Sequence, residues 1–312
     1  VGDVLGGRAL VAGADAAGQG NLSIQATGIV ASAIGADGDV TLDAGSGHID
    51  VGTLVVMNDY RLSGGSFSAG ALSPIGAMAG TWTLTDTGGF DFTGLTLTYN
   101  GDIEINAADV ITGGLVQSIL GSVRIGGPAD IDIDGLYAAH DVTVTSAGAL
   151  TAGSATAYGG SINLTGASVT VAGYADASGN VLVTATNGAA DIGAATAGGD
   201  ITVLATNGSA RLRAASLTGL TGDLLVSATD GDATLGAVDY TSISTDNVLT
   251  RAAGGTGSVT VTAANGDARV YLDTTNTALN LLQGSNVDVT IASGSAGFGT
   301  LTALYGDGYV EA

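Results

Sequence analysis

Four aspartates in the stretch ADIDIDGLYAAHD have a spacing that could bind a metal ion. Asp130, Asp132, Asp134 and Asp141, together with Gly135, lie at the offsets of an EF-hand calcium loop, with Asp in place of the final Glu. The same stretch also alternates apolar and polar residues as a β-strand does, and Asp141 is the turn residue of the next repeat. We therefore expect a strand and no cofactor, and we keep calcium bound by these four aspartates as the alternative.

Other aspartates recur at equivalent positions of neighbouring repeats. Asp39 and Asp59, or Asp200 and Asp223, are expected to lie in adjacent coils, where like charges repel unless they are hydrogen-bonded or bridged by a cation. Short polar side chains commonly cap the open backbone groups of tight turns. We predict turn capping, with a bridging cation as the alternative.

Catalytic chemistry has one candidate location, the loop-rich stretch 239–284 with Asp246, Arg251 and Asp273. Polysaccharide lyases and hydrolases need carboxylates or basic side chains gathered in a cleft. Elsewhere the loops are short, lysine is absent, and the arginines are scattered. We expect no enzyme, and a carbohydrate-active enzyme is an alternative reading.

Ice binding is a further alternative, because it needs Thr-x-Thr pairs aligned over consecutive coils. Three pairs fit this pattern locally, namely Thr83/Thr85, Thr143/Thr145 and Thr260/Thr262. Intervening repeats place Glu104, Arg124, Asn163 and Leu204 at the corresponding positions. The array is therefore interrupted, and we do not favour this function.

Repeats of about 20 residues organise the whole chain. The segment GNVLVTATNG at 179–188 returns as GDITVLATNG at 199–208. Equivalent starts occur at Gly2, Gly20, Gly38, Asn58, Gly80, Gly101, Gly121, His140, Gly160, Gly179, Gly199, Gly222, Gly257 and Ser285. The longest steps follow Gly222 and Gly257, where the pattern becomes irregular.

Each position of the repeat has a physical meaning. The first is mostly Gly, which suggests a positive φ, and the second is always Asp, Asn, Ser or Thr, which suggests a turn. The third and fifth positions are apolar in nearly every repeat, so one face of a strand is buried. We predict that Val181 and Val183 stack on Ile201 and Val203, and that Glu104 pairs with Arg124 on the outside.

These strands are too short to form a sheet within one repeat, so each must pair with its equivalent in the next repeat. The sequence therefore predicts an all-β fold, a right-handed parallel β-helix of about 14 to 15 coils of roughly 20 residues each. We expect one solenoid domain over residues 1–312, with longer irregular loops within 239–284.

Composition limits the partners. The chain has a net charge of -22, which repels nucleic acid and anionic membrane surfaces. No apolar run is long enough to span a bilayer, so we expect no membrane insertion. The chain contains no cysteine, which excludes disulfides and thiolate metal sites.

The units GDVTLDAGSGHIDVGTL, GDIEINAADVITGG, HDVTVTSAGALTAGSATA and GGSINLTGASVTVAG resemble the repeats of filamentous haemagglutinin-like exoproteins, the bacterial adhesins exported by two-partner secretion. The resemblance implies a β-helical shaft on the bacterial cell surface or in the extracellular space, with roles in adhesion, biofilm or fibre formation. It also implies partners among host or bacterial surface glycans and proteins. Because the chain starts and stops within the repeat pattern, we expect a segment of a longer array, or copies that join end to end.

Overall fold

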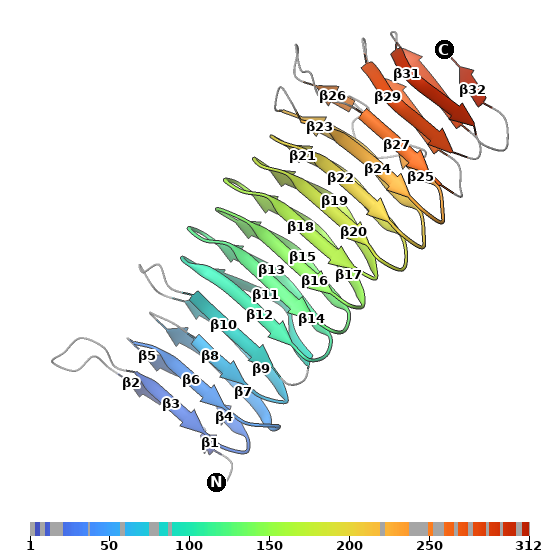
Figure 1. Cartoon of the computed structure of the whole chain (residues 1–312). Helices are drawn as coiled ribbons and strands as arrows, with labels where there is room; N and C mark the ends of the chain where they lie inside the picture. The colour runs from blue at the N-terminus through green and yellow to red at the C-terminus, as the bar shows by residue number, and fades with distance from the viewer. Residues whose placement is uncertain are drawn as a thin grey trace. The chain divides into compact units, whose positions relative to one another are not determined.

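The computed structural model describes residues 4–6, 10–12, 21–36, 38–56, 60–74, 81–86, 89–218, 222–236, 249–251, 259–264, 268–273, 277–284, 287–293, 296–303 and 308–311. Over these residues the chain is all-β, and its parallel strands stack in a β-solenoid of about nine turns of about 20 residues (Figure 1). The predicted parallel β-helix is therefore confirmed. The expected 14 to 15 coils include repeat starts that lie outside the described residues, namely Gly2, Gly20, Asn58, Gly80, Gly257 and Ser285.

The chain divides into two compact units, Val1–Ala149 and Leu150–Ala312, which we call unit 1 and unit 2. Each unit contains strands of two parallel sheets, named here sheet A and sheet B. The expectation of a single domain over 1–312 stays a prediction. The irregular loops expected within 239–284 fall largely outside the described residues.

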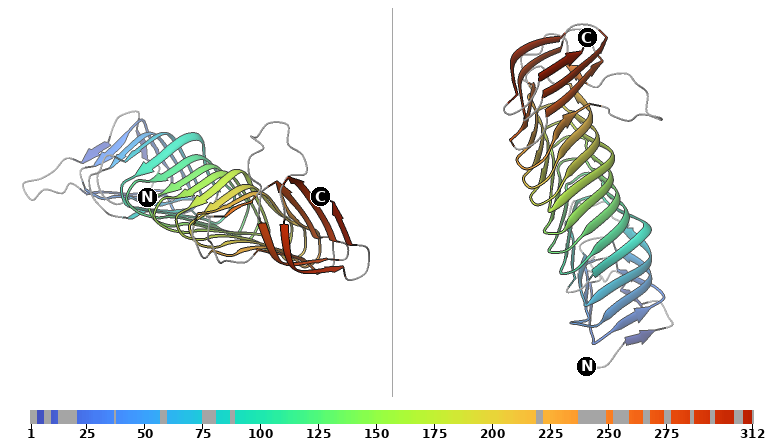
Figure 2. Two further views of the ribbon diagram at one scale, coloured as in Figure 1. Left: turned by 90° about the horizontal axis from the view of Figure 1, so that it is seen from above. Right: turned by 90° about the vertical axis from the view of Figure 1, so that its right-hand side faces the viewer.

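In unit 1, the described strand pairings are parallel, and each joins one coil to the next (Figure 2). Sheet A contains β1 (Val4–Gly6), β2 (Leu10–Ala12), β4 (Ile29–Ala31), β5 (Ile34–Ala36), β7 (His48–Val56), β9 (Ser66–Pro74), β11 (Gly89–Tyr99), β13 (Ile111–Ser118) and β15 (Ile131–Ala138). Sheet B contains β3 (Leu22–Gln25), β6 (Val40–Asp43), β8 (Tyr60–Ser63), β10 (Thr81–Asp86), β12 (Asp102–Ala107), β14 (Val123–Gly127) and β16 (Val142–Ser146).

Unit 2 has the same organisation. Its sheet A contains β17 (Ala149–Ala157), β19 (Ser168–Ala177), β21 (Ala190–Ala197), β23 (Ala210–Leu217), β25 (Ala233–Leu235), β26 (Leu249–Arg251), β28 (Ala268–Asp273), β30 (Val287–Ser293) and β32 (Gly308–Glu311). Its sheet B contains β18 (Ile162–Gly166), β20 (Val181–Ala185), β22 (Ile201–Ala205), β24 (Leu224–Ala228), β27 (Val259–Ala263), β29 (Thr277–Gly284) and β31 (Ala296–Ala303).

Strands β20 and β22 illustrate how the repeat folds. In both, the first, third and fifth residues are buried and the two between them are half-exposed. The strands pair in parallel with Val181 beside Ile201 and Val183 beside Val203. All four side chains are fully buried. The predicted aliphatic ladder is therefore confirmed, because period-2 alternation leaves one face of each strand to form the core.

The core of unit 1 is rich in aromatic side chains. Phe67, Trp82, Phe90, Phe92 and Tyr99 are almost completely buried. The ring centroid of Phe90 lies 5.3 Å from that of Phe67 and 4.8 Å from that of Phe92, within the range of favourable aromatic pairs. In the described part of unit 2, the buried hydrophobic side chains are Ala, Val, Ile and Leu.

Candidate functional site

The four candidate calcium ligands occupy different parts of two neighbouring coils in unit 1. Asp132 and Asp134 are exposed on the outward face of β15, two residues apart. Asp130 precedes the strand, and its Oδ1 accepts a hydrogen bond from the N–H of Ala149 at 2.7 Å. Asp141 comes after the corner that follows β15, beyond roughly 13 Å of extended strand from Asp134 at about 3.3 Å per residue.

No three His, Asp or Glu side chains within the described residues lie close enough together to hold a metal ion. The structure therefore does not gather Asp130, Asp132, Asp134 and Asp141 into a set of ligands. The physical reason is the strand itself, since its pleat points Asp132 and Asp134 outward while the chain carries Asp141 away to the next corner. The strand interpretation of this segment is confirmed.

The turn residues form hydrogen bonds to the next coil. A side-chain oxygen at the second repeat position accepts the backbone N–H of the equivalent residue one coil later. These bonds run from Asn21 to Asp39 (2.8 Å), Asp102 to Ser122 (2.8 Å), Ser122 to Asp141 (3.3 Å), Ser161 to Asn180 (3.0 Å), Asn180 to Asp200 (2.8 Å) and Asp200 to Asp223 (2.9 Å). We call this row the turn ladder.

The turn ladder complements the backbone ladder of sheet B. The carbonyl of each turn residue accepts a hydrogen bond from the strand of the preceding coil, as Val181 N–H donates to Asp200 (2.8 Å) and Ile201 N–H donates to Asp223 (2.9 Å). The amide of the turn residue is bonded by the side chain one coil earlier, so the backbone donor and acceptor of these exposed turn residues are both joined to the preceding coil. Turn capping is thus confirmed, although the capped amide belongs to the next coil, and this role requires no bridging cation.

The glycine that precedes most turn residues leaves room for this bond. A Cβ at Gly199 would collide with Oδ1 of Asn180, and a Cβ at Gly121 would collide with Oδ1 and the backbone nitrogen of Asp102. The described glycines with positive φ are Gly45, Gly94 and Gly236. The predicted positive φ is therefore wrong at Gly121 and Gly199, where close approach between coils is the reason for glycine. The pairing of Gly with a polar residue in most repeats was the sequence feature that could have revealed this contact.

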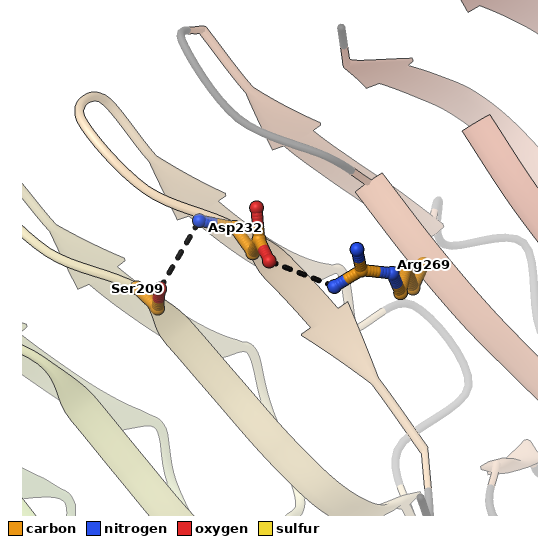
Figure 3. Close-up of polar contacts among 3 residues, drawn as sticks. All are labelled: Ser209, Asp232 and Arg269. Carbon is orange, nitrogen blue, oxygen red and sulfur yellow. Dashed lines mark hydrogen bonds and ion pairs between the residues drawn. The ribbon is translucent and has the colours of Figure 1, made fainter. Parts of the chain in front are cut away.

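Two ion pairs also connect coils of unit 2. Arg213 Nη2 lies 2.8 Å from Asp191 Oδ2, and Arg269 Nη1 lies 2.7 Å from Asp232 Oδ2. Asp232 also donates its N–H to Ser209 Oγ at 3.1 Å, so this residue contacts a coil on either side (Figure 3). Because all four charged side chains are about a third or more exposed, each pair contributes about 0–1 kcal/mol to stability.

Glu104 and Arg124 do lie side by side in the register of β12 and β14. They are not among the ion pairs of the described residues, and Glu104 Oε1 accepts a hydrogen bond from Asn106 Nδ2 at 3.0 Å instead. The predicted position is therefore confirmed, and the predicted ion pair is wrong. A partner on the same strand satisfies the carboxylate without ordering the long arginine side chain.

The side chains considered for catalysis lie outside the described part of the chain, and the threonines considered for ice binding are separated by charged residues. Asp246 and the side chains of Arg251 and Asp273 lie outside the described residues. Within unit 1, the register of sheet B places Glu104 and Arg124 between Thr83 and Thr143. Charged positions thus separate these two threonine pairs, as the sequence predicted.

One carboxyl group has a clearly shifted pKa. Hydrogen bonds from the backbone N–H and the hydroxyl of Thr93 lower the pKa of Asp91 below its usual value of 3.8, and burial opposes this shift. The N–H bond is 3.0 Å long. It lies beside Gly94, which has a φ of 74° at the irregularity in β11. Asp91 therefore stabilises a local turn.

The described residues contain no helix that is long and apolar enough to cross a membrane. No protein family, curated protein or solved structure matches the chain. The class that the fold defines is a parallel β-solenoid whose coils are joined by strand pairing and by the turn ladder.

Proposed function

We propose that the chain is a non-enzymatic structural shaft of an extracellular bacterial adhesin or surface fibre. The turn ladder is the observation that carries this proposal. In both units the same bond recurs from coil to coil. The polar side chain at the second repeat position therefore joins coils. A shaft needs this property, whereas an enzyme needs side chains that converge on a substrate.

The arrangement suits a protein under load. Neighbouring coils share a row of parallel strand bonds in each sheet, and the turn ladder adds a side-chain bond at the corner. Separating two coils along the stack requires several of these bonds to break together. Composition agrees with export, since the chain lacks cysteine and carries a net charge of -22.

The proposed partners follow from the repeat and from the resemblance to filamentous haemagglutinin-like repeats. Each coil offers the same backbone donors and acceptors to the coil before it and the coil after it. Further coils of the same kind, in a longer polypeptide or in a second copy joined end to end, would continue both ladders. Surface glycans or proteins of a host or of other bacteria would be bound by parts of the assembly that the shaft presents.

Protease treatment of intact source cells tests this function. A surface shaft should release peptides of this chain into the medium while cytoplasmic marker proteins stay intact. Antibodies against the chain should also label unpermeabilised cells. Labelling that appears only after permeabilisation would contradict the proposal, whatever the fold.

A further inference from the structure

Among the described side chains of unit 2, the outward side of sheet B from β18 to β27 carries no charge. The outward positions of β20, β22 and β24 hold Leu182, Thr184, Thr202, Leu204, Leu225 and Ser227, all half-exposed. Each residue lies beside its equivalent in the next strand, so the six form two columns across the sheet. We call the outward side of sheet B in unit 2 the neutral face.

The two columns continue without charge on both sides of these strands. Asn163 and Thr165 precede them on β18, and Thr260 and Thr262 follow on β27. Several of the hydroxyl and amide groups bond to one another, as Thr262 Oγ1 does to Ser227 Oγ at 2.9 Å. These groups are therefore less dependent on water, which lowers the cost of covering the face.

Charge is concentrated elsewhere in the same coils. The outward side of sheet A holds Asp176, Asp191, Arg211 and Arg213, and the turns hold Asp200 and other aspartates. For a chain with a net charge of -22, the neutral face is the surface of these coils that a partner can cover without removing ions from water.

We propose that the neutral face binds the neutral face of a second copy of this chain. The period of the surface favours this partner. Equivalent side chains recur at the strand spacing of about 4.8 Å, and two sheets pack face to face by interdigitating their side chains. A second copy has the same period, so its leucines and threonines can meet those of the first over several neighbouring strands. A partner without this period would lose register after a few strands.

The contact is expected to be weak in an isolated chain. Five strands about 4.8 Å apart with two outward columns cover an area far below the about 800 Å² per partner of a stable complex. Pairing should strengthen with salt, because ions screen the repulsion between two acidic chains and leave apolar contacts intact. In a longer array the contact would be repeated and its strength multiplied.

Engineered cysteines test the proposal, because the chain has none of its own. Thr202→Cys places a thiol in the centre of the neutral face, and Ser216→Cys places one at similar exposure on the outward side of sheet A, beside the uncharged Thr196 and Thr250. Under oxidising conditions we expect the Thr202→Cys chain to form disulfide-linked dimers several-fold faster than the Ser216→Cys chain. High salt should increase the rate of the Thr202→Cys chain.

Adding Leu204→Ala and Leu225→Ala to the Thr202→Cys chain removes the apolar contact without adding charge, and it should reduce the rate to that of the control. Circular dichroism should show an unchanged fold, since both leucines point outward. Equal rates for the two cysteine positions, or a rate that the alanines leave unchanged, would overturn the proposal. The inference is independent of the surface-shaft function, because a surface shaft can fail this test and a pairing protein can fail the protease test.

Discussion

Unit 1 and unit 2 build the same coil around different interiors. Among the side chains that the structure describes, the buried aromatic residues, Trp82, Tyr99, Phe90 and Phe92 among them, all belong to unit 1. In unit 2 the described interior consists of Ala, Val, Ile and Leu, with alanine frequent in sheet A, as at Ala190, Ala195 and Ala197. The coil therefore depends on alternation and on the turns, and it tolerates a wide range of side-chain volumes inside.

The aromatic interior requires a compensating small residue. Phe92 of β11 lies beside Gly113 of β13, and a Cβ on Gly113 would overlap the Phe92 ring. The next residue in this column is Ile133. In this column large and small side chains thus alternate between coils, whereas in unit 2 the column of Val181 and Ile201 stacks residues of similar size. The comparison indicates that unit 1 is packed coil against coil more specifically.

The largest effect is expected from a charge in the narrow interior of unit 2. Val203→Asp places a carboxylate in a fully buried column with no partner, and it should cost about 4 kcal/mol or more of unfolding free energy. Chemical denaturation measures this loss. The adjacent Leu204→Asp, which points outward, should cost less than about 1 kcal/mol and is the matched control. Equal losses would mean that the assignment of faces is wrong.

Gly113→Ala tests the specific packing of unit 1. The new methyl group overlaps the Phe92 ring and should destabilise the protein by about 3 kcal/mol. Adding Phe92→Leu should recover part of this loss, although Phe92→Leu alone is destabilising. Gly126→Ala is the control, since its methyl group would meet a movable side-chain oxygen of Asn106 at 3.1 Å and the Thr145 carbonyl at an ordinary contact distance of 3.9 Å. Additive losses in the double variant would contradict the proposed ring contact.

The turn ladder should contribute similarly in both units. Asn180→Ala in unit 2 and Asp102→Ala in unit 1 each remove the acceptor of one amide and should cost about 1 kcal/mol. Hydrogen exchange of the Asp200 and Ser122 amides should become faster in the respective variants. Asn180→Asp keeps an acceptor oxygen and should leave the exchange nearly unchanged. A fast-exchanging Asp200 amide in the original protein would contradict the ladder.

The smallest effect concerns acid stability at Asp91 in unit 1. Because the folded-state pKa is lowered, the stabilisation is present above the ordinary value of 3.8 and is lost as the pH falls through the lowered pKa. Asp91→Asn should remove this part of the pH dependence and lower stability slightly at neutral pH. Denaturation curves of both proteins across the acidic range measure the difference. Parallel pH profiles would show that the Thr93 bonds contribute nothing.

Much of the fold follows from the sequence because its determinants are local. The period of about 20 residues, the alternation around Val181 and Ile201, and the polar residue at each turn predict parallel strands stacked coil on coil. The strand at Asp130–Asp134 follows in the same way, since Ile131 and Ile133 alternate with the aspartates. Side-chain period and turn chemistry do not depend on distant contacts, so a single sequence is enough to read them.

The tertiary structure decided what lies between coils. The sequence alone predicted that Glu104 lies beside Arg124, but it did not predict that Glu104 bonds to Asn106. It also attributed the turn glycines to backbone conformation, whereas the structure shows close approach between coils. The Asn180 side chain could bond within its own turn or to the amide of Asp200. The distance between the two stacked coils decides which bond forms. The fit of the Phe92 ring over Gly113 depends on the same stacking. Such contacts join residues about 20 positions apart, and only the stacked coils bring them together.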